Sequence, residues 1–189
     1  RPEHPRQRRS VRVGQRRELR HEPARQRHHP LVNHIDADRR QVIEADGARF
    51  VAETDQRFDV LMVDAFDTHG MPPELGTGRF YDDCHDVLAP DGLMVVNLHA
   101  GHPHCPVYID RMRRSFNGRV LRVDDADGSN AVVFAAKGDG LRRAVGRPVR
   151  KPVTLGDEPW AQLQGVFARV ASALRASPGA GHDERPRQP

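Results

Sequence analysis

Residues 58–64 read Phe-Asp-Val-Leu-Met-Val-Asp, and this stretch decides the fold. Its apolar residues are nearly continuous, without the alternation of a half-exposed strand, which is typical of a buried strand in a parallel sheet. A second such run, Leu-Met-Val-Val-Asn-Leu, occupies residues 93–98, and a segment with helical spacing lies between the two at residues 78–88. This strand–helix–strand order predicts two parallel strands joined by a right-handed crossover.

Further elements extend this unit on both sides. We expect a short strand at 41–46, a helical turn at 48–54, a helix at 107–116, a hairpin of strands at 119–123 and 131–136, and an amphipathic helix at 157–175. The helix carries an apolar stripe that predicts either core or dimer packing, formed by Trp160, Leu163, Phe167, Val170 and Leu174. Parallel strands followed by an antiparallel hairpin predict an α/β fold, namely a partial class I methyltransferase-like Rossmann fold with a C-terminal helix.

The charge is divided unevenly along the chain. Residues 1–30 hold ten arginines and three glutamates, a net of +7, whereas residues 31–189 hold 20 basic and 23 acidic side chains, a net of −3. So basic and apolar-poor a segment cannot bury enough surface to fold, and it has no aromatic residues to stack on bases. We therefore expect residues 1–37 to be disordered or non-native, and we do not expect a nucleic-acid partner.

The remaining boundaries follow from composition. We expect a Rossmann-like domain at 38–138, a linker at 139–156, the amphipathic helix at 157–175 with Asp157 as its N-cap, and a disordered tail at 176–189. No apolar run approaches the roughly 18 residues that span a bilayer, and no secretory signal fits the N-terminus. The two cysteines do not make a disulfide framework, so we expect a reduced, cytoplasmic protein without a membrane partner.

Polar residues follow three of the expected strands. The first strand ends in Asp46-Gly47, the second is followed by Asp64 and Asp67, and the third ends in Asn97 and His99. Ligands of open α/β sheets bind at the carboxyl ends of the strands, so these ends predict a site. From spacing alone, Asp64 and Asp67 could equally bond to loop amides, and Asp46-Gly47 could be an ordinary helix start.

The chain resembles the spermidine synthases, the polyamine aminopropyltransferases, over residues 41–137. The resemblance rests on EADG at 44–47, FDVLMVDAFD at 58–67, RFYDDCHDVLAPDGLMVVNLH at 79–99 and DGSNAVVFAAKG at 127–138. It implies the C-terminal part of that family's Rossmann domain, truncated on its N-terminal side. It also implies transfer of an aminopropyl group from decarboxylated S-adenosylmethionine to a small amine such as putrescine.

The same resemblance implies roles for four residues. Asp64 would accept a proton from the attacking amine, and Asp67 would hold the amine substrate. Asp46 and Gly47 would contact the adenine of the donor. Asn97 and His99 are expected to make local hydrogen bonds.

Other functions stay open because the family's glycine-rich donor loop is missing: no Gly-x-Gly-x-Gly occurs in the chain. The transferase could therefore be inactive. The alternatives are an S-adenosylmethionine-dependent methyltransferase and a non-catalytic module that binds a partner or forms a homodimer. No metal is expected, because the histidines and the cysteine of residues 99–105 lack a standard ligand spacing and predict a solvated loop.

Overall fold

A five-stranded mixed sheet organises the computed structural model, which describes residues 12–14, 43–65 and 70–177. The strands are β1 (Arg12–Gly14), β2 (Phe58–Val63), β3 (Leu88–His99), β4 (Val120–Asp124) and β5 (Asn130–Ala136). Their order across the sheet is β1-β2-β3-β5-β4. β2 and β3 are parallel, and the other three pairs are antiparallel. The predicted fold, with parallel strands ending in an antiparallel hairpin, is confirmed.

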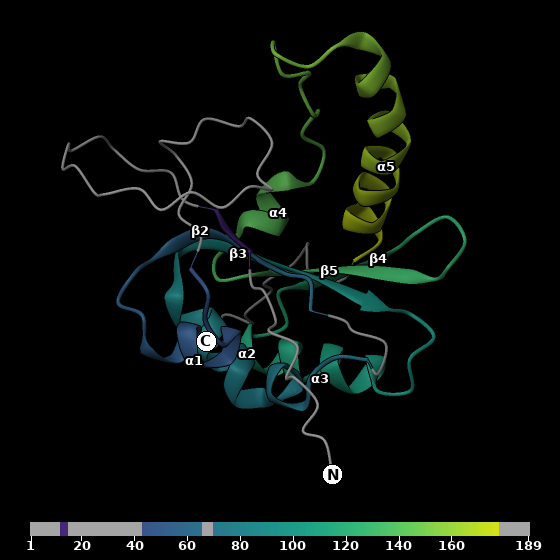
Figure 1. The fold of residues 1–189 in the computed structure, drawn as a ribbon. Helices are drawn as coiled ribbons and strands as arrows, with labels where there is room; N and C mark the ends of the chain where they lie inside the picture. Colours follow the sequence, from purple (N-terminus) through teal and green to yellow (C-terminus); the bar gives the residue numbers. More distant parts are fainter. Residues whose placement is uncertain (1–11, 15–42, 66–69, 178–189) are drawn as a thin grey trace, which may run out of the picture.

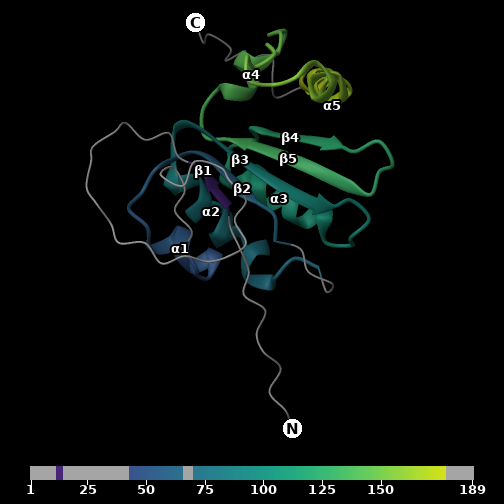
Figure 2. The same cartoon turned by 45° about the horizontal axis from the view of Figure 1, so that its top comes forward.

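Helices lie on both sides of this sheet. They are α1 (Gly47–Glu53), the short 3-10 helix η2 (Pro73–Gly76), α2 (Gly78–Val87), α3 (Cys105–Ser115), α4 (Gly140–Ala144) and α5 (Asp157–Ala176). Figure 1 shows α1, α2 and α3 below the sheet and α4 and α5 above it. Figure 2, turned toward the upper side, shows the same separation, with α5 above β4 and β5.

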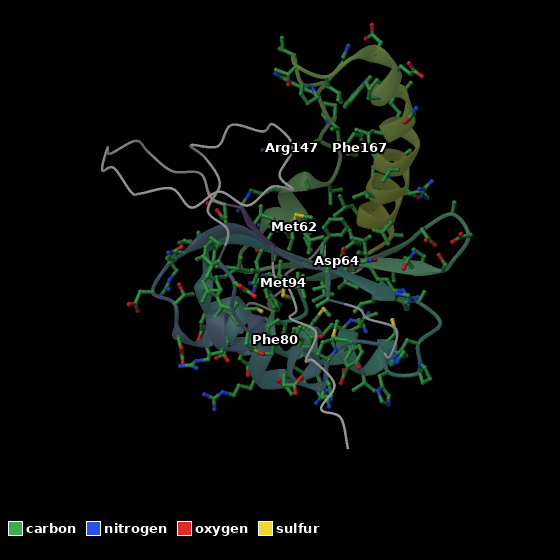
Figure 3. All side chains as sticks on the ribbon, in the orientation of Figure 1. Met62, Asp64, Phe80, Met94, Arg147 and Phe167 are labelled. Atoms are coloured by element: carbon green, nitrogen blue, oxygen red, sulfur yellow. The ribbon has the colours of Figure 1, made fainter. Side chains whose placement is uncertain are left out.

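The main core lies between the sheet and the lower helices. Met94 of β3 is fully buried on this side, together with Phe80 of α2, whereas Met62 of β2 points to the other side and is 50% exposed. Figure 3 shows Met62 and Met94 on opposite sides of the strands. The apolar run of β2 is therefore buried on the side of the lower helices, whereas Met62 on the other side is half exposed.

The crossover helix α2 is fixed at both ends by side chains. The Thr77 hydroxyl accepts a hydrogen bond from the amide of Phe80 at 3.1 Å, which caps the start of the helix. At the other end the ammonium of Lys137 donates to the carbonyls of Asp86 and Leu88 at 3.1 and 2.9 Å. A cation at a helix C-terminus is favourable, so Lys137 ties the end of β5 to α2.

Several local expectations need correction. Residues 43–46 form no strand, and residues 41–42 lie outside the described residues. Gly156, and not Asp157, is the N-cap of α5, whose first turn contains Asp157. The stretch predicted to be a linker contains the short helix α4.

The basic N-terminal segment contributes three described residues. Arg12–Gly14 form β1, which pairs antiparallel with β2 from Arg12–Met62 to Gly14–Val60. These residues are therefore a strand where disorder was expected. The remainder of residues 1–37 and the tail from residue 178 lie outside the described residues, so the division of the chain into domains stays a prediction.

The first half of β3 depends on a residue without a side chain, Gly92. A Cβ atom at Gly92 would lie 2.9 Å from the carbonyl oxygen of Phe58 and 3.0 Å from that of Ala89. Both are backbone atoms that cannot rotate away. We expect Gly92→Ala to lower the free energy of unfolding by roughly 1–3 kcal/mol, measured by urea denaturation.

Gly101 provides the matched control, because a Cβ atom there would meet nothing within 4 Å. Gly101→Ala should leave the denaturation midpoint nearly unchanged. Equal effects of the two substitutions would contradict the steric role of Gly92.

Candidate functional site

The carboxyl ends of the two parallel strands bring Asp64 and Asn97 together. Asp64 follows β2 directly and is exposed, and Asn97 is a half-buried residue near the end of β3. The side-chain amide of Asn97 donates to Oδ1 of Asp64 at 3.3 Å, which is long for a hydrogen bond. An exposed carboxylate with one lateral donor keeps lone pairs directed at solvent, where a cationic ligand can reach them.

This juxtaposition follows from the register of the sheet. Val63 pairs with Val96 in the parallel β2–β3 ladder, so the next residues, Asp64 and Asn97, are also neighbours. Both valines are buried on the helix side, which fixes the register because a slip of one residue would expose them. Asn97 was expected to make local hydrogen bonds, but its partner Asp64 lies 33 positions away in the sequence, at the end of the neighbouring strand. Aligning the carboxyl ends of the two predicted parallel strands could have predicted this contact from the sequence.

Asp46 and Gly47 lie at the start of α1, apart from this pair. Oδ1 of Asp46 accepts a hydrogen bond from the amide of Arg49 at 2.9 Å, which makes Asp46 the N-cap of the helix. Gly47 is buried as the first helical residue. The structure shows a helix start at these two residues, and their contact with the adenine of a donor stays a prediction.

Asp67 lies among residues 66–69, outside the described residues, and its place in the site stays a prediction.

A tight turn borders the same edge of the sheet. His99, at the end of β3, pairs with Asn130, the first residue of β5, and the amide of Ala100 donates to the carbonyl of Ser129 at 3.0 Å. The hairpin turn at residues 125–129 therefore lies beside the end of β3 and forms a rim of the candidate site. A hairpin was expected at this place, and the pairing of β4 with β5 confirms it.

The carboxylate of Asp125 organises this turn. Its Oδ2 accepts hydrogen bonds from the hydroxyl of Ser129 at 3.0 Å and from the amide of Asn130 at 3.1 Å. Desolvation raises the pKa of Asp125, but these donors, together with the Asn130 side chain and Asp127, outweigh it and lower the pKa below its ordinary 3.8. The ionised carboxylate is the form that holds the turn.

The histidine-rich loop packs around an aromatic residue. The rings of His102 and His104 lie with their centroids 6.2 and 6.1 Å from that of Tyr108, at the start of α3. Cys105, the first residue of α3, is buried and is a free thiol. Within the described ranges, no three His, Cys, Asp or Glu residues are grouped as metal ligands.

The two free thiols are poor nucleophiles. Cys84 and Cys105 are 0% and 1% exposed, and burial raises the pKa of each thiol above its ordinary value. The thiolate is the reactive form, so neither cysteine contributes to the chemistry of this edge.

Two hollows of the described surface lie away from Asp64. A groove of about 370 Å³ runs between residues 146–149 and α5, and a smaller one is lined by residues of β4 and α4. The support for a site at Asp64 is its position at the carboxyl end of β2, beside Asn97. No helix among the described residues is long and apolar enough to cross a lipid bilayer.

The described residues form a methyltransferase-like Rossmann fold of the mixed α/β class. Its features are the order of the strands, a single parallel pair joined by a crossover helix, and an antiparallel hairpin at the end of the sheet. A crystal structure of a probable spermidine synthase from Corynebacterium glutamicum superposes with a TM-score of 0.51 at 18% identity. The superposition covers 82% of this chain and 58% of that one. At this identity the likeness concerns the fold.

The sequence comparisons identify the relatives. Residues 24–115 match the family model described as the spermine/spermidine synthase domain. A polyamine aminopropyltransferase from Neisseria meningitidis serogroup A is 32% identical over 144 residues, which cover 76% of this chain and 53% of the relative. One from Chromobacterium violaceum is 34% identical over 95 residues, which cover 50% of this chain and 36% of the relative. The chain is thus similar to spermidine synthases, as its motifs predict, and it spans about half the length of the Neisseria relative.

The turn held by Asp125 should make the stability of the fold depend on pH. Because the folded-state pKa is lowered, the carboxylate stabilises the fold above its ordinary pKa of 3.8, and this contribution is lost as the pH falls through the lowered value. We expect Asp125→Asn to lower the thermal midpoint at pH 7.

The difference between wild type and Asp125→Asn should shrink as the pH is lowered below about 3.8. Asp59→Asn, at an exposed position in β2, is the control and should have little effect. A difference that stays constant across this pH range would show that the charge of Asp125 does not matter.

Proposed function

We propose that this chain contains the amine-acceptor side of an aminopropyltransferase site, with Asp64 as the proton acceptor. The observation that carries the proposal is the exposed Asp64 carboxylate at the carboxyl end of β2, held laterally by Asn97 at 3.3 Å. The match to the spermine/spermidine synthase domain, which includes both residues, supports the same role.

The chemistry requires a carboxylate at this place. The proposed reaction is the displacement of a thioether from a sulfonium by an amine. At neutral pH a diamine such as putrescine is doubly protonated and has no free lone pair with which to attack. A positioned carboxylate removes one proton and directs the resulting lone pair at the carbon.

The step balances without an oxidant or a metal. Asp64 takes a proton from one ammonium group, and the neutral nitrogen forms a bond to the methylene carbon beside the sulfonium. The carbon–sulfur bond breaks as that bond forms, and sulfur keeps the electron pair. The products are the aminopropylated amine and neutral 5′-methylthioadenosine.

The second ammonium of a diamine needs a separate anionic partner. Asp67, three residues after Asp64, is proposed for this role, because a carboxylate binds an ammonium by a charge-assisted hydrogen bond. A monoamine would lack this contact, so the arrangement favours diamines.

Asp46 and Gly47 are proposed as the adenine contacts of the donor, decarboxylated S-adenosylmethionine. The cap of α1 uses Oδ1 of Asp46, so Oδ2 can accept a hydrogen bond from an exocyclic amine. Gly47 follows Asp46 directly, as the first residue of α1. We also propose that the protein acts in the cytoplasm and that its substrates are small molecules.

Asn97 is proposed as a positioning residue for Asp64. Its amide binds one carboxylate oxygen, so the other is left directed at the amine. Asn97→Leu should reduce the rate more than it weakens binding of the nucleoside.

The central test is aminopropyl transfer by the chain and its variants, followed by mass spectrometry of the polyamine product. Asp64→Asn should lower the rate by about 100-fold or more, because the amide cannot take the proton. Asp59→Asn serves as the control, since Asp59 is an exposed carboxylate of the same strand. Equal rates for wild type and Asp64→Asn would remove Asp64 from the mechanism.

Calorimetry separates this function from its alternatives. Binding of 5′-methylthioadenosine that tightens with putrescine supports the aminopropyltransferase. Binding of S-adenosylhomocysteine alone supports a methyltransferase. If neither nucleoside binds, the chain is not an enzyme of either kind by itself, and the non-catalytic module is the better description.

A further inference from the structure

A groove beside α5 has no part in the chemistry proposed at Asp64. It has a volume of about 370 Å³ and lies between residues 146–149 and one side of the helix. Figure 3 shows Arg147 and Phe167 on its two walls, above the sheet. Small-molecule sites have volumes of roughly 300–1,000 Å³ and mostly apolar linings, so the groove is large enough for a small ligand.

The helical wall of the groove is apolar and aromatic. The ring centroids of Trp160 and Phe167 lie 5.6 Å apart, and both residues are half-buried. Ala168 and Ala171 line the groove from the same side of the helix, and their small side chains leave room beside the rings. Because aromatic rings favour stacked or edge-on contacts with other rings, this wall favours a ligand with a flat ring system.

The charged residues of the groove are all cationic. Arg147 lies on the wall formed by the segment before α5, and Arg175 lies in the last turn of the helix. The described residues that line the groove include no aspartate and no glutamate. The ligand that complements this lining is therefore an anion, whereas the amine proposed to bind at Asp64 is a cation.

The two arginines of the groove are available to such a ligand. Arg143 of the neighbouring α4 already forms an ion pair with Asp91 at 2.6 Å. Both Arg147 and Arg175 are exposed, and neither forms an ion pair with a carboxylate of the described residues. A guanidinium presents a planar fork of donors that binds a carboxylate or a phosphate by two parallel hydrogen bonds.

We propose that this groove binds a small aromatic anion, that is, a molecule with a flat ring system and an acidic oxyanion group. The rings pack on Trp160 and Phe167, and the oxyanion binds Arg147, while Arg175 adds to the positive potential of the groove. This inference uses no residue of the site at Asp64 and does not depend on the proposed enzymatic function.

The chain contains its own reporter for the first test, because Trp160 is its single tryptophan. Energy transfer from Trp160 to 8-anilinonaphthalene-1-sulfonate, a fluorescent aromatic anion, reports binding in the groove of the full chain. Wild type should bind this probe saturably. Arg147→Gln should raise the dissociation constant about tenfold, because it removes a charge-assisted hydrogen bond. Arg169→Gln removes the same charge from an exposed residue on the opposite side of α5 and should have little effect.

A second pair of measurements separates charge from shape. N-phenyl-1-naphthylamine has the same rings without the sulfonate, so Arg147→Gln should leave its dissociation constant nearly unchanged. Ala168→Leu narrows the groove and should weaken binding of both probes. Gln162→Leu, at an exposed position on the other side of the helix, should weaken neither. Circular dichroism of all variants checks that the fold is intact.

Competition identifies the acidic group that the groove prefers. 1-Naphthoate and 1-naphthyl phosphate present a carboxylate and a phosphate on the same ring system. Displacement of the fluorescent probe by either one supports the proposal, and the one that acts at the lower concentration carries the preferred group. Putrescine should leave the probe bound, because the described lining of the groove has no carboxylate to hold an ammonium.

Each of four results would overturn the proposal. They are the absence of saturable energy transfer from Trp160 in wild type, equal losses of affinity in Arg147→Gln and Arg169→Gln, no displacement by either naphthyl acid, and displacement by putrescine. None of them bears on aminopropyl transfer, which is measured separately.

Discussion

β2 and β3 run parallel, and the pairing of Val63 with Val96 sets the positions of the residues that follow. Both valines are buried against the helices below the sheet, at 1% and 0% exposure. A shift of one residue would turn these side chains to the opposite face, at a cost of about 1.5–3 kcal/mol for each buried valine. The contact between Asp64 and Asn97 is therefore a consequence of core packing, and the candidate site inherits the rigidity of the sheet.

The two faces of the sheet differ in what covers them. The lower face packs on α1, α2 and α3, and its side chains make up the core. The upper face meets only α4 and α5 among the described elements, and Met62 is half exposed there. The buried apolar core of the described residues therefore lies on the lower face of the sheet.

The sequence predicted those parts that depend on local pattern. The runs at residues 58–64 and 93–98 predicted the parallel pair, and the turn-rich stretch between β4 and β5 predicted the hairpin, because burial periodicity and turn chemistry are local. It missed the strand pairing of Arg12–Gly14, which is nonlocal and has no apolar signature. It also assigned a strand to residues 41–46, but the described residues 43–46 form no strand and Asp46 is the N-cap of α1. Asp64 was identified by motif, but its partner Asn97 required the register.

The proposed function depends on the Asp64 carboxylate, which would bind the amine substrate and accept its proton. The most direct measurement is carbon-13 NMR of the aspartate carboxyl groups during titration with putrescine, with the Asp64 signal assigned by its loss in Asp64→Asn. The account predicts a saturable shift of the Asp64 signal, while that of Asp59, an exposed carboxylate on the same strand, stays in place. An Asp64 signal that does not move, or that moves only together with every surface aspartate, would contradict it.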